Sequence, residues 1–443
     1  MARITEQTIE KVRSNSDIVE VIQGYVRIKQ RGRNFFGLCP FHNEKTPSFS
    51  INPDKQIFKC FGCGLGGGVI NFIMEIEKLD FKESIIFLAE HSGVEIELDE
   101  SYKGSNDLTQ QLLKIHTQVS EIFTSNFDTD EGKQIYQHLI ERGLAKETIK
   151  TFNLGFSINK GKQVLQYLQT QKYTSDALLK SGLFVDTKRG YIDRFKGRII
   201  FPIHNPTGKT IAFSGRVVND GKIAKYVNSP ETPIYHKSNV LYGLHESKHH
   251  IRTSKAAIVV EGYFDYLQLF QSGIKNVVAI SGTAFTDKHA QLLRRYTTNI
   301  FLAYDGDKAG VAAAIKAGYI LLKHGHNPRI INMPKDIDPD DWVLREGPNP
   351  FNKSLEKASN IIDFHMENAP YDMNTESGKF NFIEESLNDI SQIEDPVYRE
   401  LQIKSLSGIS QISEQSIYEK LNGIINSKTR YKPKQKIDYK TNF

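Results

Sequence analysis

Hydrophobic and polar residues repeat with different periods in successive parts of this chain of 443 residues. Residues 6–22, 68–77 and 81–91 have apolar side chains at the three- and four-residue spacing of amphipathic helices. Between the first two of these helices the pattern changes to short strands and loops around the cysteines. We therefore expect a small first segment, ending near residue 100, in which helices flank a compact β region.

A second segment, from about 108 to 365, begins with helical spacing and becomes β-rich at Arg194. Four short apolar runs follow, each separated from the next by a helical stretch: 257–260, 276–280, 300–304 and 329–333. Strands that alternate with helices in this way predict a parallel sheet with right-handed crossovers. The last segment shows helical spacing without chemical motifs, and its basic, proline-containing end predicts disorder.

Composition is typical of a globular protein and gives no sign of a secreted or membrane protein. With 39% hydrophobic and 25% charged residues, the chain can form an ordinary globular core. Lysine and arginine exceed the acidic residues by 57 − 52 = 5, so net charge neither requires nor excludes a polyanionic partner. The sequence shows neither a signal peptide nor the run of about 18 apolar residues that spans a membrane. We expect a cytoplasmic protein with no membrane partner.

All three cysteines belong to one motif that also contains a histidine. Cys39 and His42 form a pair with two residues between them, and Cys60 and Cys63 form a second such pair. A two-residue gap lets both side chains of a pair approach one ion from a tight turn. Four nitrogen and sulfur ligands with no open position predict one structural zinc ion. The alternative, free cysteines and a chance histidine, is weakened because no cysteine lies outside the motif.

Aromatic and basic residues are interleaved around the zinc motif. They are Phe35, Phe36, Phe49, Phe58 and Phe61, with Lys29, Arg31, Arg33, Lys55 and Lys59. One interpretation is a stacking surface for single-stranded DNA. The other is that the phenylalanines fill a very small core and the cations are solvated. The sequence leaves both interpretations open.

Acidic residues follow three of the four predicted parallel strands. They are Glu261 after the first strand, Asp305 and Asp307 after the third, and Asp338, Asp340 and Asp341 after the fourth. The carboxyl ends of parallel strands share the sheet edge at which ligands bind. A single acid after a strand is more often a helix N-cap. Glu261, Asp305 and Asp307 together predict a site for Mg²⁺ or Mn²⁺ that serves phosphoryl or nucleotidyl transfer.

Several motifs resemble one known family. The zinc ribbon of bacterial DnaG-type DNA primases is similar to CPFHNEKTPSFSINPDKQIFKCFGCGLGGGVINFIM. The TOPRIM fold, which those primases share with topoisomerases and some nucleases, is similar to VVEGYFDYLQL and AYDGDKAG. The basic half of the primase polymerase core is similar to FPIHNPTGKTIAFSGRVV and KYVNSPETPIYHKSNVLYGL. The resemblance covers roughly residues 1–365, with the motifs in family order.

The resemblance implies an α+β multidomain fold. It begins with a zinc β-ribbon, continues with a mixed basic α/β subdomain and a TOPRIM parallel α/β sheet, and ends with a helical tail. We expect a zinc-binding domain at 1–100, a linker at 101–110, the basic part of the RNA polymerase core at 111–254, the TOPRIM catalytic domain at 255–340, a helical segment at 341–427 and a basic disordered tail at 428–443.

The resemblance also implies roles for individual residues. The TOPRIM metal acids correspond to Glu261, Asp305 and Asp307, and further acids near the site to Asp265, Asp338 and Asp340. Basic residues associated with template or nucleotide contacts correspond to Arg142, Arg216, Lys225 and Lys237. We expect Arg194, Lys196 and Arg198 to extend this basic ridge, although a solvated surface charge is the alternative for each.

The function implied is a primase that makes short RNA primers from ribonucleoside triphosphates on single-stranded DNA, as a monomer, with zinc and Mg²⁺ or Mn²⁺. One alternative is a TOPRIM nuclease or topoisomerase, but no tyrosine nucleophile can be identified among the 19 tyrosines. Another is a non-catalytic zinc-ribbon protein that binds single-stranded DNA. Family members continue into a domain that docks on the replicative helicase. Because few residues follow the core here, we expect that domain to be absent or truncated.

Overall fold

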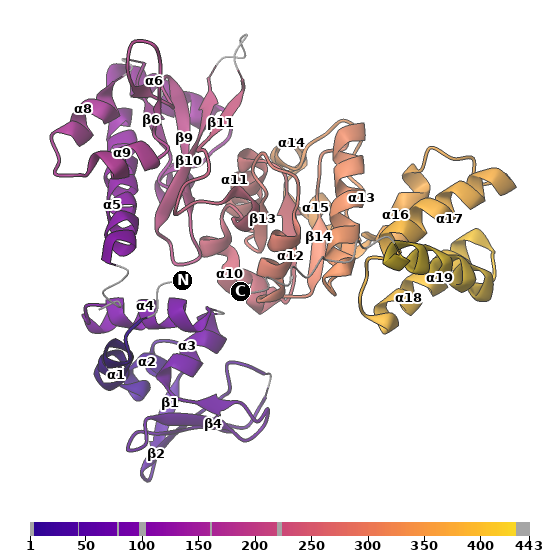
Figure 1. Ribbon diagram of the computed structural model, residues 1–443, viewed down its shortest axis with the longest axis horizontal. Helices are drawn as coiled ribbons and strands as arrows, with labels where there is room; N and C mark the ends of the chain where they lie inside the picture. Colours follow the sequence, from indigo (N-terminus) through magenta and orange to yellow (C-terminus); the bar gives the residue numbers. More distant parts are fainter. Residues whose placement is uncertain are drawn as a thin grey trace, which may run out of the picture. The chain divides into compact units, whose positions relative to one another are not determined.

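The computed structural model describes residues 4–42, 44–77, 79–96, 103–159, 162–218 and 224–430 (Figure 1). The chain divides into two compact units, Met1–Gln111 and Leu112–Phe443. Among the described residues, we find no helix with the length and apolar composition that crossing a bilayer requires.

The first unit packs helices against a five-stranded sheet in which each strand pairs antiparallel with the next. The strands are β1 (Ile28–Arg31), β2 (Asn34–Gly37), β3 (Phe49–Asn52), β4 (Ile57–Cys60) and β5 (Gly66–Gly67). The helices are α1 (Glu6–Asn15), α2 (Ile18–Gln23), α3 (Val69–Glu77) and α4 (Phe81–Ser92). The single helix that we expected at 6–22 is two helices, because the carboxylate of Asp17 accepts the Val19 and Glu20 N–H groups and starts α2.

The core of the first unit decides between the two interpretations of its aromatic residues. Phe49 and Phe58 are buried and stacked, with ring centroids 5.3 Å apart, and Phe72 packs edge-on against Phe58. Phe61, in contrast, is 74% exposed. The fully buried phenylalanines therefore form the core that a small zinc module needs. Of the five phenylalanines around the zinc motif, only Phe61 has a largely exposed ring.

The linker expected at 101–110 is largely helical. Helix α5 (Lys103–Ser125) begins inside it, and residues 101 and 102 lie outside the described part of the chain. The apolar side chains of α5, from Leu112 through Ile115 and Val119 to Phe123, are all buried. Once packing fixes these turns, extending the helix toward its N-terminus adds a hydrogen bond for each residue. The polar, glycine-containing composition that predicted a linker is outweighed by this effect.

The second unit opens with a basic subdomain built on an antiparallel sheet of order β11-β10-β9-β6 and a small β7-β8 pair. Its strands are β6 (Gly155–Ser157), β7 (Phe184–Val185), β8 (Ile192–Asp193), β9 (Arg198–His204), β10 (Thr210–Val217) and β11 (Tyr226–Asn228). Its helices after α5 are η2 (Asn126–Asp128), α6 (Asp130–Glu141), α7 (Lys146–Thr151), α8 (Gln163–Gln169) and α9 (Ser175–Lys180).

The predicted parallel sheet is confirmed. Its order is β13-β12-β14-β15-β16, and every pair is parallel except the last. The strands are β12 (Ala257–Val260), β13 (Val277–Ala279), β14 (Asn299–Leu302), β15 (Asn327–Ile330) and β16 (Ser359–Asn360). The helices around it are η3 (Lys237–Asn239), α10 (Leu244–Ser254), α11 (Tyr263–Gln271), α12 (Asp287–Arg294) and α13 (Lys308–Lys323). The sequence pattern missed β16, because a two-residue strand has no periodicity.

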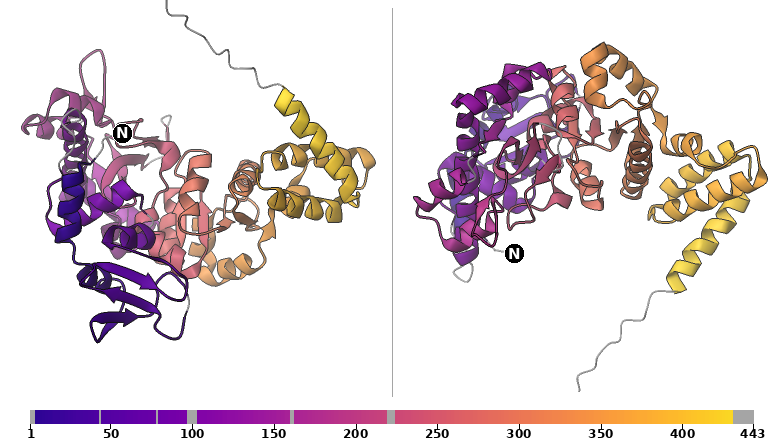
Figure 2. Two further views of the ribbon diagram at one scale, coloured as in Figure 1. Left: turned by 60° about the horizontal axis from the view of Figure 1, so that its bottom comes forward. Right: turned by 90° about the horizontal axis from the view of Figure 1, so that it is seen from above.

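Helices form the end of the second unit (Figures 1 and 2). They are α14 (Pro339–Glu346), α15 (Pro348–Glu356), α16 (Ile361–Asn368), α17 (Glu376–Ile390), α18 (Pro396–Ser410) and α19 (Glu414–Arg430). The last three pack on one another, and the buried side chains of Phe382, Leu387 and Leu406 belong to a core that continues to the parallel sheet. The tail expected at 428–443 lies outside the described residues from position 431 onward.

Candidate functional site

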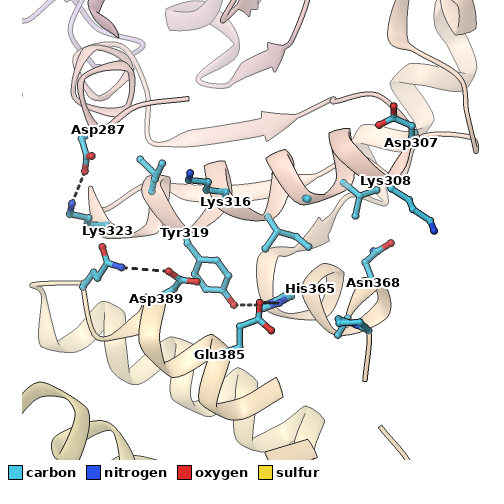
Figure 3. A pocket seen from close by; sticks show the side chains of 18 residues that line it. Asp287, Asp307, Lys308, Lys316, Tyr319, Lys323, His365, Asn368, Glu385 and Asp389 are labelled. Atoms are coloured by element: carbon cyan, nitrogen blue, oxygen red, sulfur yellow. Dashed lines mark hydrogen bonds and ion pairs between the residues drawn. The ribbon is translucent and has the colours of Figure 1, made fainter. Parts of the chain in front are cut away.

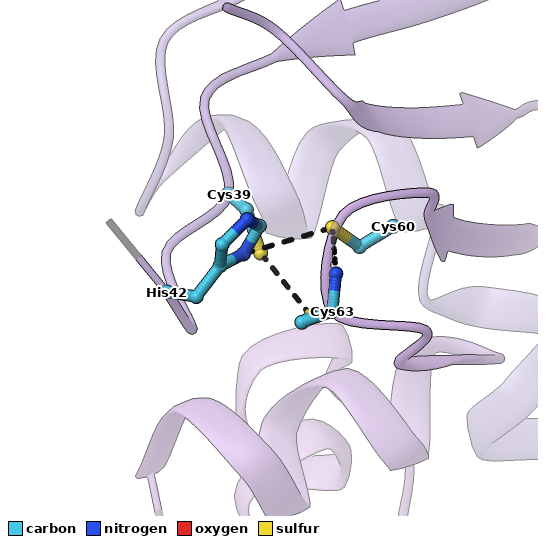
Figure 4. A group of neighbouring side chains, drawn as sticks. All are labelled: Cys39, His42, Cys60 and Cys63. Carbon is cyan, nitrogen blue, oxygen red and sulfur yellow. Dashed lines mark hydrogen bonds between the residues drawn. The ribbon is translucent and has the colours of Figure 1, made fainter. Parts of the chain in front are cut away.

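The four predicted zinc ligands come together at one end of the ribbon (Figure 4). The Sγ atoms of Cys39 and Cys60, the Sγ of Cys63 and a ring nitrogen of His42 all lie within 4.8 Å of one another. The Sγ atoms of Cys39 and Cys63 are 3.9 Å apart, and Cys60 Sγ is 3.8 Å from His42 Nδ1. Ligands at 2.0–2.3 Å from a tetrahedral ion are separated by about 3.6–3.8 Å. The cluster therefore has the size and donor chemistry of a closed zinc site.

Glu44 supports this cluster, and the sequence analysis missed it. Its Oε2 lies 3.3 Å from His42 Nε2, while His42 Nδ1 faces Cys60. Its Oε1 accepts the Cys39 N–H at 2.7 Å and the Ser48 N–H at 3.1 Å. A carboxylate on the outer nitrogen of a ligating histidine fixes the ring and its tautomer. An acid two residues after the histidine was the available signal.

The predicted acids gather at the carboxyl edge of the parallel sheet, where β12, β14 and β15 end. Among the described residues, the closest carboxylate group is Asp265, Asp338 and Asp340, with oxygens within 4.8 Å of one another. Asp265 lies on the first turn of α11, four residues after Glu261, and Asp338 caps α14. Asp265 Oδ2 accepts the Gly262 N–H at 2.8 Å, and its Oδ1 accepts the Asp340 N–H at 3.3 Å.

At this edge, burial and neighbouring carboxylates affect the pKa values of the acids more than the nearby cations do. Burial, and then the charge of Asp305, raise the pKa of Glu261 to about 7. Burial, followed by the charges of Asp338 and Asp307, raises the pKa of Asp305 to about 6, opposed by the Lys225 cation. Burial and then Asp338 raise the pKa of Asp340 to about 7. Such shifts in a cleft mark a functional-site candidate.

The acids also fit a divalent cation. Glu261 Oε1 and Asp305 Oδ1 are buried and, within the described part of the chain, have no hydrogen-bond partner. Buried carboxylate oxygens without a donor are costly, and a hard cation satisfies them. Asp307 and Asp338 do serve as N-caps, accepting the Gly310 and Asp341 N–H groups, as the alternative interpretation held. Each retains a second carboxylate oxygen for another ligand.

One predicted arginine contacts these acids, and a second lies over a neighbouring aromatic ring. Arg142, which follows α6, places Nη2 3.3 Å from Asp340 Oδ2. Arg216, on β10, is 6% exposed, and its guanidinium lies over the Tyr226 ring at 5.9 Å. Lys225 and Lys196 are exposed, and Lys237 is half-buried on η3. Arg142 and Lys225 therefore meet the acidic edge, and Arg216 lies over the Tyr226 ring, on which the charges of Arg216 and Asp265 both act.

Arg194 and Arg198 do not extend a basic ridge as we expected. Arg194 Nε donates to the Gly182 carbonyl at 2.9 Å. Arg198 is 7% exposed, and its Nη1 donates to the carbonyls of Gly215, Ala224 and Lys225 at 3.0–3.2 Å. These guanidiniums hold the sheet and its loops together, so we correct the expectation for both. Lys196, which lies between them, points to solvent.

A cleft of about 950 Å³ follows α13 away from the acids (Figure 3). One wall is α13 (Lys308–Lys323) with its N-cap Asp307, and the other includes His365 of α16 and Glu385 of α17. A hydrogen bond of 2.9 Å joins Tyr319 Oη to His365 Nδ1 across it. Lys323 is paired with Asp287 at 2.6 Å. The cleft therefore lies between α13 and the final helices, and its lining carries charges of both signs.

Comparison with known families agrees with this arrangement. The model of the CHC2 zinc finger matches residues 4–104, and the model of the N-terminal domain of the DNA primase catalytic core matches 122–248. A Toprim-like model matches 258–343. The model of the DnaB-helicase binding domain of primase matches 369–415, which overturns our expectation that such a domain is absent or truncated. Helical spacing without motifs had given no sign of it.

Curated relatives and solved structures are similar over most of the chain. A DNA primase of Clostridium acetobutylicum is 38% identical over 422 residues, which is 94% of this chain and 70% of the relative. A DNA primase of Geobacillus stearothermophilus is 36% identical over 448 residues, covering 99% of this chain and 74% of the relative.

The zinc-binding and RNA polymerase domains of the Aquifex aeolicus primase superpose with a TM-score of 0.62 and 30% identity. They cover 93% of this chain and 98% of theirs. A DnaG catalytic domain bound to single-stranded DNA superposes with a TM-score of 0.64 and 32% identity. It covers 70% of this chain and 99% of its own. Neither the nuclease or topoisomerase alternative nor the non-catalytic alternative is favoured. The chain belongs to the bacterial DnaG-type DNA primases, nucleotidyltransferases that make RNA primers for DNA replication.

Proposed function

We propose that RNA synthesis takes place at the carboxyl edge of the parallel sheet, with Glu261, Asp305 and Asp307 as the ligands of catalytic Mg²⁺ or Mn²⁺. The observation that carries this proposal is the pair of buried, unpartnered carboxylate oxygens on Glu261 and Asp305 within the described residues. A bound divalent cation supplies Lewis-acid stabilisation of charge on phosphoryl oxygens. Asp265, Asp338 and Asp340 act as further acids that hold this edge in shape.

The basic residues bind the phosphates of the substrates. The 3′-hydroxyl of one ribonucleotide attacks the α-phosphate of the next, and pyrophosphate leaves. Arg142 and Arg216 offer guanidinium donors to phosphate oxygens, which suits them to the incoming triphosphate. Lys225, whose charge acts on Asp305, and Lys237 and Lys196 bind the backbone of the DNA template as point charges.

We further propose that the first unit binds one structural zinc ion and helps to select the template start. Cys39, His42, Cys60 and Cys63 fill a tetrahedral shell, so the ion has no position for substrate. Its contribution is to fold the ribbon that presents Phe61 and the neighbouring lysine Lys59 to a single strand.

The partners follow from the same assignment. The template is single-stranded DNA, as in the solved DnaG catalytic domain bound to it, and the substrates are ribonucleoside triphosphates. The segment 369–415 binds the replicative helicase, in keeping with the description of the family model that it matches. The chain acts in the cytoplasm, at the replication fork, as a monomer.

Manganese binding tests the metal assignment without relying on catalysis. Titration of the chain with Mn²⁺, followed by electron paramagnetic resonance, is expected to show tight binding that Asp305→Asn and Glu261→Gln weaken. The matched control is Asp336→Asn, an exposed acid on the loop that precedes Asp338. Equal Mn²⁺ affinity in the control and in Asp305→Asn would overturn the assignment.

A further inference from the structure

A single aromatic ring lies beneath both arginines of the candidate site. Phe264, on the first turn of α11, is 4% exposed. The Cζ atom of Arg142 lies over its ring, 4.7 Å from the centroid, and the Cζ atom of Arg216 lies 4.9 Å from the same centroid. Arg142 comes from the end of α6 and Arg216 from β10, so one ring organises guanidiniums from two distant elements.

Arg216 shows why an aromatic ring suits this position. Its Nε and Nη1 are buried and have no hydrogen-bond partner among the described residues. Burying an unpaired guanidinium is costly, and a carboxylate partner would offset that cost by occupying its donors. The face of a ring stabilises the cation electrostatically and leaves every N–H group available. Phe264 therefore holds the buried guanidinium of Arg216 in place while its Nε and Nη1 can still donate to an anion.

Both the backbone and the side chain of Arg142 contact helix α11 or residues next to it. Its backbone carbonyl accepts Gln268 Nε2 at 3.1 Å, and the next carbonyl, of Gly143, accepts Gln271 Nε2 at 2.7 Å. Its guanidinium meets the Phe264 ring and Asp340. Helix α11 begins two residues after Glu261 and carries Asp265, so the ring and these acids belong to one rigid segment. The distance between the acids and the two cations is thereby fixed.

We propose that Phe264 is a positioning residue, which presents Arg142 and Arg216 to the triphosphate of the incoming ribonucleotide. This inference rests on the proposed function, in which these two arginines bind that phosphate. Without the ring, Arg142 and Arg216 lose the π face that both contact, and Arg216 is left with the more distant Tyr226 ring. The ring touches no substrate, so its loss acts through binding of the triphosphate and leaves the chemical step unchanged.

The test is steady-state primer synthesis by the full chain on single-stranded DNA, with the ribonucleotide concentration varied. Phe264→Leu is expected to raise KM for ribonucleotides about 5- to 30-fold, the loss of one to two cation–π contacts, with kcat within about 2-fold. Phe264→Tyr retains the ring and is expected to restore KM. Phe264→Met, which refills the space without a ring, is expected to behave as the leucine variant and replaces it if that variant does not fold.

The matched control is Phe152→Leu, a buried phenylalanine that packs on Tyr266 and Phe270 of the same helix, and no arginine lies over its ring among the described residues. It loses similar core volume, so it is expected to lower thermal stability as much as Phe264→Leu and leave KM unchanged. Equal KM values in Phe264→Leu and Phe152→Leu would refute the positioning role. Arg216→Lys separates a failure of the proposed phosphate contact from a failure of the positioning role. If Arg216→Lys also leaves KM unchanged, the proposed phosphate contact is wrong. If Arg216→Lys raises KM while Phe264→Leu does not, only the role of Phe264 is wrong.

Discussion

Replacing Arg198 with methionine tests whether this residue holds the basic subdomain together or binds DNA. The buried Nη1 donates to the carbonyls of Gly215, Ala224 and Lys225. A hydrogen bond from a charged donor contributes about 1.5–3 kcal/mol. Because one nitrogen is shared among three acceptors and methionine is easily buried, we expect a net loss of about 2 kcal/mol. That loss corresponds to a roughly 30-fold change in the unfolding equilibrium.

The assay is urea unfolding followed by fluorescence of Trp342, the single tryptophan, which lies in the same unit as Arg198. In parallel, affinity for single-stranded DNA is measured against salt, where each phosphate contact contributes about 0.7 to the logarithmic slope. Arg198→Met is expected to keep the slope. The control Lys196→Met, at an exposed neighbour, is expected to lose about 0.7 of slope and less than about 0.5 kcal/mol of stability. A stable Arg198→Met with a reduced slope would refute the structural role.

Three further predictions concern the zinc site, pH and the final helices. Cys60→Ala is expected to abolish binding of one zinc equivalent, and Glu44→Gln is expected to weaken zinc binding about 10- to 100-fold. Competition with a chromogenic chelator measures both affinities. Unchanged zinc affinity in Glu44→Gln would contradict the supporting role of Glu44. Burial lowers the pKa of His116 to about 4, whereas an unfolded histidine titrates near 6.5, so only the unfolded chain takes up this proton between those values. The stability contributed by His116 is therefore complete above pH 6.5 and falls by about 2 kcal/mol by pH 5. In urea titrations, the free energy of unfolding of His116→Leu should depend less on pH than that of the unmodified chain. An equal pH dependence in both would contradict the lowered pKa of His116. Removal of residues 369–430 is expected to abolish co-sedimentation with the replicative helicase and retain binding of single-stranded DNA, and retained helicase binding would place the docking surface elsewhere.

The local chemistry of this chain could be predicted from sequence where spacing alone defines it. The ligands Cys39, His42, Cys60 and Cys63 sit in two short turns, so their convergence requires only a hairpin between the pairs. The acids Glu261 and Asp305 were predicted for a similar reason, because adjacent parallel strands bring their carboxyl ends to one edge.

The features that the sequence did not predict depend on packing between distant segments. In the sequence, Arg198 and Lys196 are two basic residues with nothing to separate their roles. Only the three carbonyl groups that accept hydrogen bonds from Arg198 show that it is a buried structural residue, whereas Lys196 is a surface charge. The role of Phe264 requires Arg142 and Arg216 to approach it from other elements. At the start of α5, tertiary packing overrode the local preference of a polar, glycine-containing run.

The most direct test of the account is primer synthesis itself. The chain is incubated with single-stranded DNA, labelled ribonucleotides and Mg²⁺, and the products are separated by length. We predict short RNA from the unmodified chain, and at least about a 100-fold lower rate from Asp305→Asn under conditions in which both bind the DNA equally. Primer synthesis by Asp305→Asn at the unmodified rate would contradict the claim that the carboxyl edge of the parallel sheet is the site of RNA synthesis.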